Sequence, residues 1–432
     1  MPTVVVVGGG MAGVACAREL GRNDVEVVLV DRNDYLQFQP LLYQVASSQL
    51  PAEDVARPLR VVLEDLPSVT VKQMDVATID LATRTVTGQD GTGVAGDYLV
   101  LAAGAQPNFF GVPGAREHSF PLYSVVDAER LRRHLQQQLR EHSSTEGATG
   151  AEPLTVIVVG GGPTGVETAG ALGELFGALQ SQGRLAGSAS VRLVDHGKAL
   201  LSPFSEKSHQ YALEKLTDHG VLVTFGVAVS RVDADSAQLS DGTQVPTRTV
   251  IWGGGESASA VAGTCGAPPG RGGRIDVAAD LSVPGFPGVY AIGDVANIPG
   301  PGDRALPQLG SVAQQSGKWA AGNILARLSG SAEAGTPFRY KDKGIMAMIG
   351  RNSAVAEVGK HRHQVEGPIA FCAWLGLHAI LLSGVHNRVD AFLEWTDDYF
   401  HADRAPDLEA GGTASRIAWS DDPADRPTIN AT

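Results

Sequence analysis

The sequence predicts an α/β protein in which two units share one plan of strand, glycine turn, helix and second strand. In the first unit, the apolar run Thr3–Val7 precedes a glycine turn, a helix over residues 12–20 and an apolar strand that ends at Asp31. The same order returns between Leu154 and Asp195. Continuous apolar strands of this kind are buried on both faces, as in parallel sheets covered by helices. We therefore expect two Rossmann-like domains, each suited to bind a dinucleotide.

The first glycine turn has the spacing GxGxxG, and each glycine has its own expected role. Gly8 would make the tight turn, Gly10 would let the backbone approach a pyrophosphate, and Gly13 would let the helix pack against the strand. The start of the helix offers free N–H groups and a partial positive charge to phosphates. Asp31 can accept hydrogen bonds from ribose hydroxyls. A plain structural turn is the alternative, but the strand, helix and acid in register favour cofactor binding.

The second turn repeats this spacing with Gly160, Gly162 and Gly165, and Pro163 suits the first turn of the following helix. The acid at the end of the second strand is Asp195, and its separation from the turn exceeds the usual spacing of about 20 residues. It is therefore a less secure ribose ligand than its counterpart in the first unit. An acid here would repel a 2′-phosphate, which favours NADH over NADPH. Two such turns in one chain indicate one resident redox dinucleotide and one exchangeable nicotinamide.

Other segments have simpler interpretations. Residues 37–46 are apolar and rich in amides, and Pro40 restrains the residue before it, so we expect a loop packed against the protein. Residues 127–142 are typical of a surface helix, and residues 143–152, rich in Gly, Ser and Thr, of a linker. We also expect alternating strands over residues 69–88, further strands over 97–104, 221–229, 250–255 and 289–294, a return crossing over 258–288 and a helix over 309–328.

Two strand ends are candidates for close contact with a cofactor. The strand over residues 97–104 ends in small residues and Gly104, which permit close approach of a ligand or of a neighbouring loop. A second, short buried strand ends at Gly293 and Asp294. Gly293 would admit a cofactor backbone, and Asp294 would accept a hydrogen bond from a ribityl hydroxyl. The alternative for Asp294 is a cap of a turn or helix, but two dinucleotide turns in the same chain favour cofactor binding.

Composition excludes several classes of partner. The net charge of −13 argues against nucleic acid and against polybasic attachment to anionic lipid. Cys16, Cys265 and Cys372 lack metal-ligand spacing, so we expect neither a disulfide framework nor a bound metal. This use of cysteine is typical of a reducing compartment. Because a core strand begins by Thr3, no room is left for a signal peptide, and we expect a cytoplasmic protein.

Together these motifs resemble those of the two-dinucleotide-binding flavoproteins, and within them the type II NADH:quinone dehydrogenases. The resemblance extends from Val4 to about Arg404, and its most specific parts are residues 38–46 (FQPLLYQVA), 160–167 and 341–351 (KDKGIMAMIGR). It implies a respiratory NADH dehydrogenase that does not pump protons. Such an enzyme passes hydride from NADH to FAD and then two electrons to a membrane quinone.

The resemblance also implies a domain order. Residues 1–111 and 258–335 would form the FAD-binding domain, and residues 112–257 an NADH-binding domain inserted in it. Residues 336–404 would form a C-terminal region, with amphipathic helices, for quinone binding and membrane attachment. The tail 405–432, rich in Asp, Gly and Pro, is expected to be disordered.

Roles of single residues follow from the same resemblance. Glu167 matches a glutamate near the nicotinamide and flavin rings, and Lys343 matches a lysine on the quinone side. Gln314 matches the glutamine of the quinone-site helix, although Leu309 and Gly310 replace an Ala-Gln pair that many members carry. The residues expected to bind FAD are Gly8, Gly10, Gly13, Asp31, Gln39, Gly104, Gly293 and Asp294, and those expected to bind NADH are Gly160, Gly162, Gly165 and Asp195.

The C-terminal region contains two candidate membrane segments. Residues 367–385 are apolar apart from His378 but marginal against the roughly 20 residues that span a bilayer. Residues 389–400 have the spacing of an amphipathic helix. Both could instead be core or dimer helices. The resemblance favours peripheral, monotopic attachment to the cytoplasmic face of the cell membrane, and a homodimer stays open. His378 and His386 receive no role.

Four other functions are alternatives to this one. A disulfide reductase or a sulfide:quinone reductase needs a cysteine pair beside the flavin, and none follows the first turn. A reductase of a small iron–sulfur protein stays open. So does a flavoprotein that senses NADH by changing its partner or oligomer, with little turnover.

Overall fold

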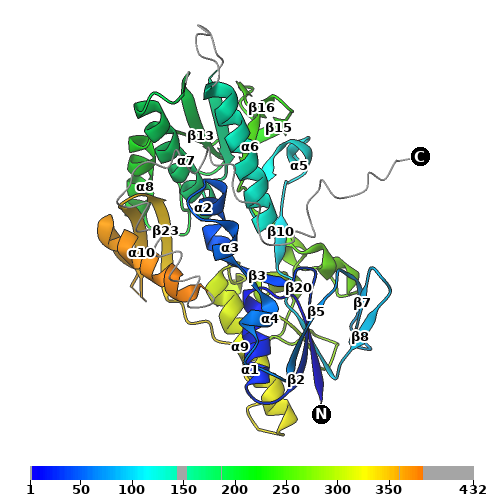
Figure 1. Cartoon of the computed structure of the whole chain (residues 1–432). Coiled ribbons are helices and arrows are strands. Elements are labelled where there is room, and N and C mark those ends of the chain that lie inside the picture. Colours follow the sequence, from blue (N-terminus) through cyan, green and yellow to red (C-terminus); the bar gives the residue numbers. More distant parts are fainter. Residues whose placement is uncertain (1, 144–152, 186, 360, 383–432) are drawn as a thin grey trace, which may run out of the picture. The chain divides into compact units, whose positions relative to one another are not determined.

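The computed structural model describes residues 2–143, 153–185, 187–359 and 361–382 (Figure 1). Contacts within the chain divide it into two compact units. Among the described residues, the first unit consists of residues 2–37, 57–106 and 256–342, and the second of those within 38–56, 107–255 and 343–382. Each unit is therefore assembled from segments that lie far apart in the sequence.

The first unit is organised around a five-stranded sheet with the order β21-β9-β1-β2-β5, in which neighbouring strands are parallel. Its strands are β1 (Thr3–Val7), β2 (Glu26–Asp31), β5 (Val69–Gln73), β9 (Tyr98–Leu101) and β21 (Val289–Ala291). Val7 pairs with Val30 on one side and with Leu101 on the other. Three strands therefore end together, at the carboxyl edge where sheets of this kind bind dinucleotides.

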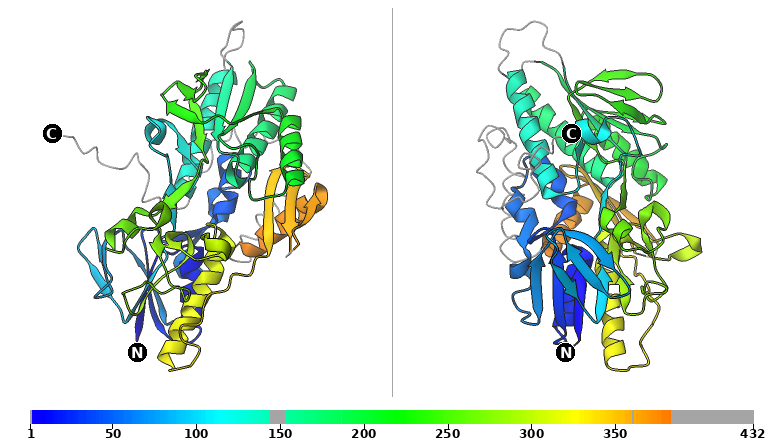
Figure 2. Two further views of the ribbon diagram at one scale, coloured as in Figure 1. Left: turned by 180° about the vertical axis from the view of Figure 1, so that it is seen from behind. Right: turned by 90° about the vertical axis from the view of Figure 1, so that its right-hand side faces the viewer.

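Helices α1 (Met11–Gly21) and α9 (Gly310–Leu328) lie side by side in the first unit (Figures 1 and 2). Val14 and Leu20 of α1 are buried in the core of this unit. A Cβ added to Gly317 of α9 would lie 2.3 Å from the carbonyl oxygen of Ala12 in α1. The two helices can approach this closely only because α9 has a glycine at their contact.

Shorter elements complete the first unit. They are β3 (Tyr35–Gln37), α4 (Leu59–Val62), β6 (Val76–Asp80), β7 (Thr85–Gly88), β8 (Gly93–Ala95), β19 (Glu256–Ala258), β20 (Ile275–Asp276) and β22 (Ala296–Asn297). Strands β6, β7 and β8 form an antiparallel sheet. Strands β4 (Ala56–Pro58) and β10 (Ala105–Pro107) lie where the chain passes from one unit to the other.

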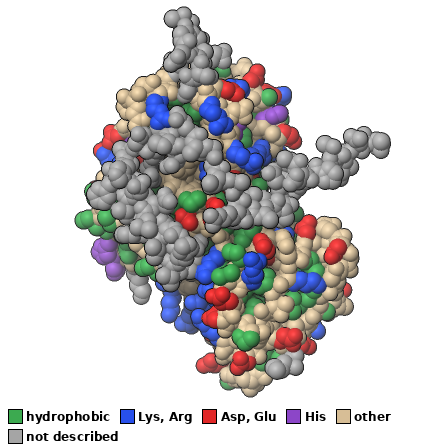
Figure 3. Space-filling model, in the orientation of Figure 1, with side chains coloured by type: hydrophobic (Ala, Val, Ile, Leu, Met, Phe, Trp, Pro, Cys, Tyr) green, Lys and Arg blue, Asp and Glu red, His purple; other side chains and the backbone are tan. Residues whose placement is uncertain are grey.

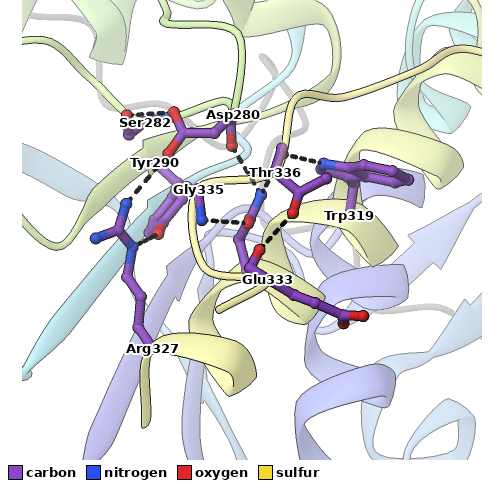
Figure 4. A network of polar contacts seen from close by, with 9 residues as sticks. Asp280, Ser282, Tyr290, Trp319, Arg327, Glu333, Gly335 and Thr336 are labelled. Atoms are coloured by element: carbon purple, nitrogen blue, oxygen red, sulfur yellow. Dashed lines mark hydrogen bonds and ion pairs between the residues drawn. The ribbon is translucent and has the colours of Figure 1, made fainter. Parts of the chain in front are cut away.

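A polar network fixes the C-terminal half of α9 in the first unit (Figure 4). Arg327 donates hydrogen bonds to the Tyr290 hydroxyl at 2.8 Å and to the Asp280 carboxylate at 3.2 Å. Asn323 donates to the carbonyl oxygens of Asp280 and Thr336 at 3.2 Å each. Because Tyr290 belongs to β21, the network joins α9 to the edge strand of the sheet.

The second unit repeats the plan, with a five-stranded parallel sheet of order β11-β18-β12-β13-β14. Its strands are β11 (Phe120–Pro121), β12 (Leu154–Val159), β13 (Ala189–Asp195), β14 (Val221–Phe225) and β18 (Thr249–Trp252). The order matches that of the first unit when β12 replaces β1 and β13 replaces β2. An antiparallel sheet of β15 (Val229–Val232), β16 (Ser236–Leu239) and β17 (Gln244–Pro246) corresponds to β6–β8.

The helices of the second unit differ in length. The longer ones are α6 (Val125–Ser143), α7 (Pro163–Ser181) and α8 (Glu206–Asp218), and the short ones are α2 (Leu42–Ala46), α3 (Ala52–Val55) and α5 (Ala115–His118). Helix α7 follows the second glycine turn and begins at Pro163, as predicted. A third sheet of β23 (Gly344–Gly350), β24 (Ser353–Val358) and β25 (His363–Glu366) leads into α10 (Pro368–Leu381).

The structure confirms most expected elements, including the helices over residues 12–20, 127–142 and 309–328. The expectation of a loop over residues 37–46 is wrong, because Gln39–Leu41 forms a 3-10 helix and α2 follows it directly. Pro40 permits this, since the first turn of a helix needs no N–H from proline. The linker over 144–152, the amphipathic helix over 389–400 and the tail from 405 lie outside the described residues. No helix within the described ranges is long and apolar enough to cross a membrane.

Replacement of Gly170 in α7 tests the packing of that helix on β23. A Cβ on Gly170 would lie 1.7 Å from the carbonyl oxygen of Ile349. We expect Gly170→Ala to lower the free energy of unfolding by about 1–3 kcal/mol, because backbone must move to admit the methyl group. Gly177→Ala in the same helix is the control, since its Cβ meets nothing within 4 Å. The control should raise stability by about 0.5–1 kcal/mol. Denaturant unfolding measures both, and a Gly170→Ala protein as stable as wild type would contradict the prediction.

Candidate functional site

The three glycines of the first turn have three different environments. Gly8 has a φ of 112°, and a Cβ there would lie 2.2 Å from the carbonyl oxygen of Ala102. A Cβ on Gly13 would lie 1.8 Å from the carbonyl oxygen of Gly8, so α1 packs directly on the turn. A Cβ on Gly10 would meet nothing within 4 Å. The first and third glycines are thus required by packing, whereas Gly10 faces open space at the start of α1.

Asp31 holds this turn in place through both carboxylate oxygens. Its Oδ2 accepts the N–H of Gly9 at 2.5 Å, and its Oδ1 accepts the N–H of Asn33 at 2.7 Å. A carboxylate offers about four acceptor positions, so it can still accept a ribose hydroxyl. Gly10 provides no side-chain cap, which leaves the first N–H groups of α1 available to an anion. These features fit the phosphate and ribose groups of a dinucleotide.

The second turn reproduces the first. Gly160 has a φ of 104°, and its Cβ would lie 2.5 Å from the carbonyl oxygen of Gly253. A Cβ on Gly165 would lie 1.8 Å from the carbonyl oxygen of Gly160. A Cβ on Gly162 would meet nothing within 4 Å. The start of α7 is therefore open to a phosphate in the same way as the start of α1.

Asp195 occupies the same position as Asp31 despite its wider spacing in the sequence. It accepts the N–H of Gly161, and the N–H of Gly197 at 2.5 Å. The extra length lies partly in α7, which has 19 residues against 11 in α1. The longer helix accounts for much of the wider spacing between the turn and Asp195. The strand nevertheless ends beside the turn, as it does in the first unit.

Asp294 has the environment of a buried acceptor in the first unit. Its Oδ1 is buried and has no hydrogen-bond partner among the residues that the structure describes. Burial raises the pKa of Asp294 to about 6, while the positive charge of Arg274 opposes the rise. Desolvation, and then the charge of Asp294, raises the pKa of Glu256 to about 7. An acceptor without a protein partner fits a hydroxyl donor of FAD, so the residues present fit that cofactor.

The other expected FAD ligands have more varied settings. Gly293 has a φ of 66°, and its Cβ would lie 2.9 Å from the Cβ of Ala12, so contact with α1 already requires a glycine. Gly104 accepts the N–H of Ser259 at 3.1 Å. Gln39 begins the 3-10 helix and belongs to the second unit, whereas the others belong to the first. The structure thus brings the glycines, Asp31 and Asp294 into one unit without Gln39.

Glu167 lies near the start of α7, with 8% of its surface exposed. The N–H of Met348 in β23 donates to its Oε1 at 3.1 Å, and the side chain of Trp374 in α10 donates a further hydrogen bond. Burial raises the pKa of Glu167 to about 8, and the two hydrogen bonds oppose this rise. The carboxyl is therefore mostly protonated at pH 7.

The expected quinone-side residues have different exposures. Gln314 in α9 is half-buried, and Lys343 is exposed. The neighbouring Gln315 donates to the carbonyl oxygen of Lys341 at 3.1 Å and accepts its N–H at 3.0 Å. This pair of bonds holds the segment just before Lys343 against α9.

Sequence reasoning missed four residues that shape these sites. Met348 and Trp374 hold Glu167, and Arg274 and Glu256 set the electrostatic surroundings of Asp294. The only sequence signal for Trp374 is that it is the one tryptophan in the apolar segment 367–385, which also contains Phe371 and His378. Met348 lies in the segment 341–351 named above, but it acts through a backbone N–H that no side-chain pattern reveals. Arg274 and Glu256 carry no local signal, because their importance depends on contacts between distant segments.

Comparisons with known proteins identify the family. The model of the family described as "Pyridine nucleotide-disulphide oxidoreductase" matches residues 2–317. The type II NADH:quinone oxidoreductase Ndh of Mycobacterium tuberculosis is 36% identical over 413 residues, which cover 91% of this chain and 87% of that protein. The chain belongs to the type II NADH:quinone oxidoreductases. A further type II NADH:quinone oxidoreductase, from Staphylococcus aureus, is 30% identical and covers 82% of this chain and 89% of its own length.

Solved structures confirm the fold expected for this type II oxidoreductase. NDH2 of Plasmodium falciparum, solved in complex with NADH, has a TM-score of 0.84 at 18% identity and covers 93% of this chain and 98% of its own. The sulfide:quinone oxidoreductase of Aquifex aeolicus has a TM-score of 0.73 at 19% identity, with 93% of this chain and 96% of its own covered. At such identities the likeness concerns the fold alone.

Two matched alanine variants test the roles of the two glycine turns. Neither Gly10→Ala nor Gly162→Ala meets protein atoms, so both should fold. We expect Gly10→Ala to lower the flavin content of the purified protein, and Gly162→Ala to weaken NADH binding by about tenfold or more, because the methyl group separates backbone from phosphate. Flavin absorbance and the KM for NADH measure these effects. Each variant is the control for the other, and an identical pattern in both would contradict the assignment.

Proposed function

We propose that this type II oxidoreductase binds FAD at its first glycine turn and NADH at its second, and passes electrons from NADH to a membrane quinone. The observation that carries the proposal is the pair of equivalent turns with a buried acid, Glu167, after the second alone. The equivalent position after the first turn is Ala15. FAD, when bound, supplies an acceptor for the hydride of NADH and returns two electrons to quinone.

The domain assignment extends this proposal. Residues 1–111 and 258–335 would hold FAD, residues 112–257 would hold NADH, and residues 336–404 would serve quinone and membrane binding. Support comes from the two equivalent parallel sheets, each followed at its glycine turn by a helix without a side-chain cap.

Residues of the first unit would bind and orient the flavin nucleotide. The free N–H groups of α1 beside Gly10 would bind its pyrophosphate, and Asp31 a ribose hydroxyl. Asp294 would accept a hydrogen bond from the ribityl chain through its unpartnered Oδ1. In the second unit, Asp195 would accept a ribose hydroxyl of NADH and would repel the 2′-phosphate of NADPH.

Glu167 would act as a neutral acid beside the nicotinamide. Because burial holds its pKa near 8, it keeps a proton at neutral pH and can donate a hydrogen bond. A group that titrates close to the operating pH can also take up or release a proton during turnover. Gln314 and Lys343 would act on the quinone side, where an exposed cation such as Lys343 can stabilise negative charge on the reduced ring.

The outer face of α10 supports attachment to a lipid surface. Ile369 and Ile380 are 73% and 67% exposed, and Leu377 and Leu381 are also exposed. No Asp, Glu, Lys or Arg occurs in Pro368–Leu381. Figure 3 shows apolar side chains at the edge of the molecule where Figure 1 draws α10. An apolar helix face of this kind suits the interface of a membrane, here on the cytoplasmic side, as a peripheral attachment.

A steady-state assay tests the function directly. The purified, FAD-loaded protein in liposomes is given NADH or NADPH, with a quinone analogue or a ferredoxin as acceptor. We expect NADH and quinone to be the preferred pair. Preferred reduction of ferredoxin would favour the alternative reductase, and rapid flavin bleaching with slow reoxidation by every acceptor would favour an NADH sensor.

Glu167→Gln tests the role of the buried acid. We expect FAD to stay bound and the rate of flavin reduction by NADH to fall by about tenfold or more. The hydride of NADH adds negative charge to the flavin, which a proton from the Glu167 carboxyl would neutralise, and an amide cannot supply that proton. Rapid mixing under anaerobic conditions measures this rate. A variant that is reduced as fast as wild type would remove Glu167 from the mechanism.

The same variant changes how stability depends on pH. Folding raises the pKa of Glu167 from 4.5 to about 8, so the folded protein binds this proton more tightly than the unfolded chain. The resulting stabilisation is complete below about pH 4.5 and is lost as the pH rises towards about 8. Glu167→Gln lacks this loss, so its unfolding temperature should rise relative to wild type across that range and then stay level. A difference that is constant from pH 5 to pH 9 would contradict the shifted pKa.

The triple variant Ile369→Glu, Leu377→Glu, Ile380→Glu tests membrane attachment through α10. We expect liposome flotation to fall by about tenfold or more, since three apolar side chains leave the lipid. Reduction of ferricyanide by NADH should be unchanged. Leu222→Glu is the control, because Leu222 is 54% exposed on β14. If the triple variant floats normally but a dimer dissociates in analytical ultracentrifugation, α10 contacts a second copy and the lipid proposal is wrong.

A further inference from the structure

Glu167 is held by side chain and backbone groups from distant parts of the second unit. It belongs to α7, Met348 to β23 and Trp374 to α10. Met348 offers a backbone N–H, which every residue except proline provides. Trp374 offers its indole N–H, which is a donor only, so its partner must be an acceptor. The hydrogen bond from Trp374 therefore depends on side-chain identity, unlike the one from Met348.

The Trp374 indole is itself tightly held. It is 1% exposed and is the largest of the fully buried side chains in the described residues. The ring of His378 stacks on it, with centroids 3.8 Å apart and planes 23° from parallel. Tyr43 of α2 meets it edge-on, with centroids 6.4 Å apart. A ring packed on two sides cannot change its rotamer freely, so the direction of its N–H is fixed.

His378 strengthens this arrangement as a neutral ring. Its Nδ1 lies 2.8 Å from the carbonyl oxygen of Trp374. A carbonyl oxygen only accepts, so Nδ1 carries the hydrogen. Burial lowers the pKa of His378 to about 4, which keeps the ring uncharged at neutral pH. No charge therefore reaches Glu167 from this neighbour.

We propose that Trp374 is a positioning residue for Glu167: its indole N–H, fixed by the packing of α10, holds the carboxyl in one orientation. This inference rests on the proposed role of Glu167 in the reaction with NADH. The titratable side chains on neighbouring elements include Tyr43 of α2, His209 of α8 and His378 of α10. None of them contributes to the shifted pKa of Glu167, whose causes are burial, Met348 and Trp374 in that order. A change in the pKa of Glu167 after replacement of Trp374 can therefore be attributed to the lost indole hydrogen bond.

Trp374→Phe removes the N–H and keeps an aromatic ring. In the FAD-loaded full chain, we expect the limiting rate of flavin reduction by NADH to fall by about tenfold, the change that an average hydrogen bond to a carboxyl produces. The KM for NADH should stay within about twofold of wild type, because the nucleotide is held at the second glycine turn. The midpoint of the pH profile should move upward, since the lost donor favoured the ionised carboxyl.

Trp319→Phe is the matched control. In the wild-type protein, the Trp319 indole donates a hydrogen bond to the carbonyl oxygen of Thr336 at 2.9 Å in the first unit. Trp319→Phe therefore also removes one indole hydrogen bond, but far from Glu167 in the sequence. Its rate and pH profile should equal those of wild type. If Trp374→Phe behaves like this control, Trp374 only fills space and the proposal is wrong. If the flavin of Glu167→Gln is reduced at the normal rate, the proposed role of Glu167 is wrong. If only Trp374→Phe is reduced at the normal rate, Glu167 keeps its role and the proposal for Trp374 alone is wrong.

A second measurement needs no variant of Trp374. Nitrogen-15 labelling of tryptophan gives one indole N–H signal for each of the five tryptophans of the chain. In the wild-type protein, one of these signals should shift between pH 6 and pH 9 as Glu167 titrates, and this shift should vanish in Glu167→Gln. Absence of any indole signal that titrates through Glu167 would overturn the proposal.

Discussion

The hydrogen bond from a turn N–H to the carboxylate at the end of the neighbouring strand is the interaction on which both glycine turns depend. Gly9 donates to Asp31, and Gly161 donates to Asp195. A charged acceptor makes this bond stronger than a neutral pair would be. Because it fixes the turn against the sheet, the next helix begins with its N–H groups free to face a phosphate. One side chain thus shapes the turn and keeps acceptor capacity for a ribose.

Desolvation sets the chemistry of the acids near these turns. The chain has a net charge of −13, yet burial keeps protons on Glu167 near neutral pH and raises the pKa of Asp294. The two cases differ in their partners. Asp294 faces the cation Arg274, whereas the groups that contact the Glu167 carboxyl within the described residues are a backbone N–H and an indole N–H. Local surroundings, and not the overall charge, therefore decide which acid can hold a proton during turnover.

Helix α10 has two faces with different surroundings. Trp374 on the inner face contacts Glu167, while Ile369 and Ile380 on the outer face are exposed. A helix turns its side chains through a full circle in about 3.6 residues, so one short segment can present both surfaces. If the outer face binds lipid as proposed, the element that anchors the protein is also the element that orients the buried acid.

The sequence by itself determined the two strand–turn–helix–strand plans, the glycine turns and the acids Asp31 and Asp195, because these features rest on local spacing and backbone freedom. The sequence did not predict the helices over residues 39–46, where Pro40 lies in the first turn of a short 3-10 helix. Only the tertiary structure decided that Trp374 would meet Glu167 and that Asp294 would be left with a buried oxygen. The reason is physical: burial and side-chain pairing depend on how distant segments pack, and no local pattern records that packing.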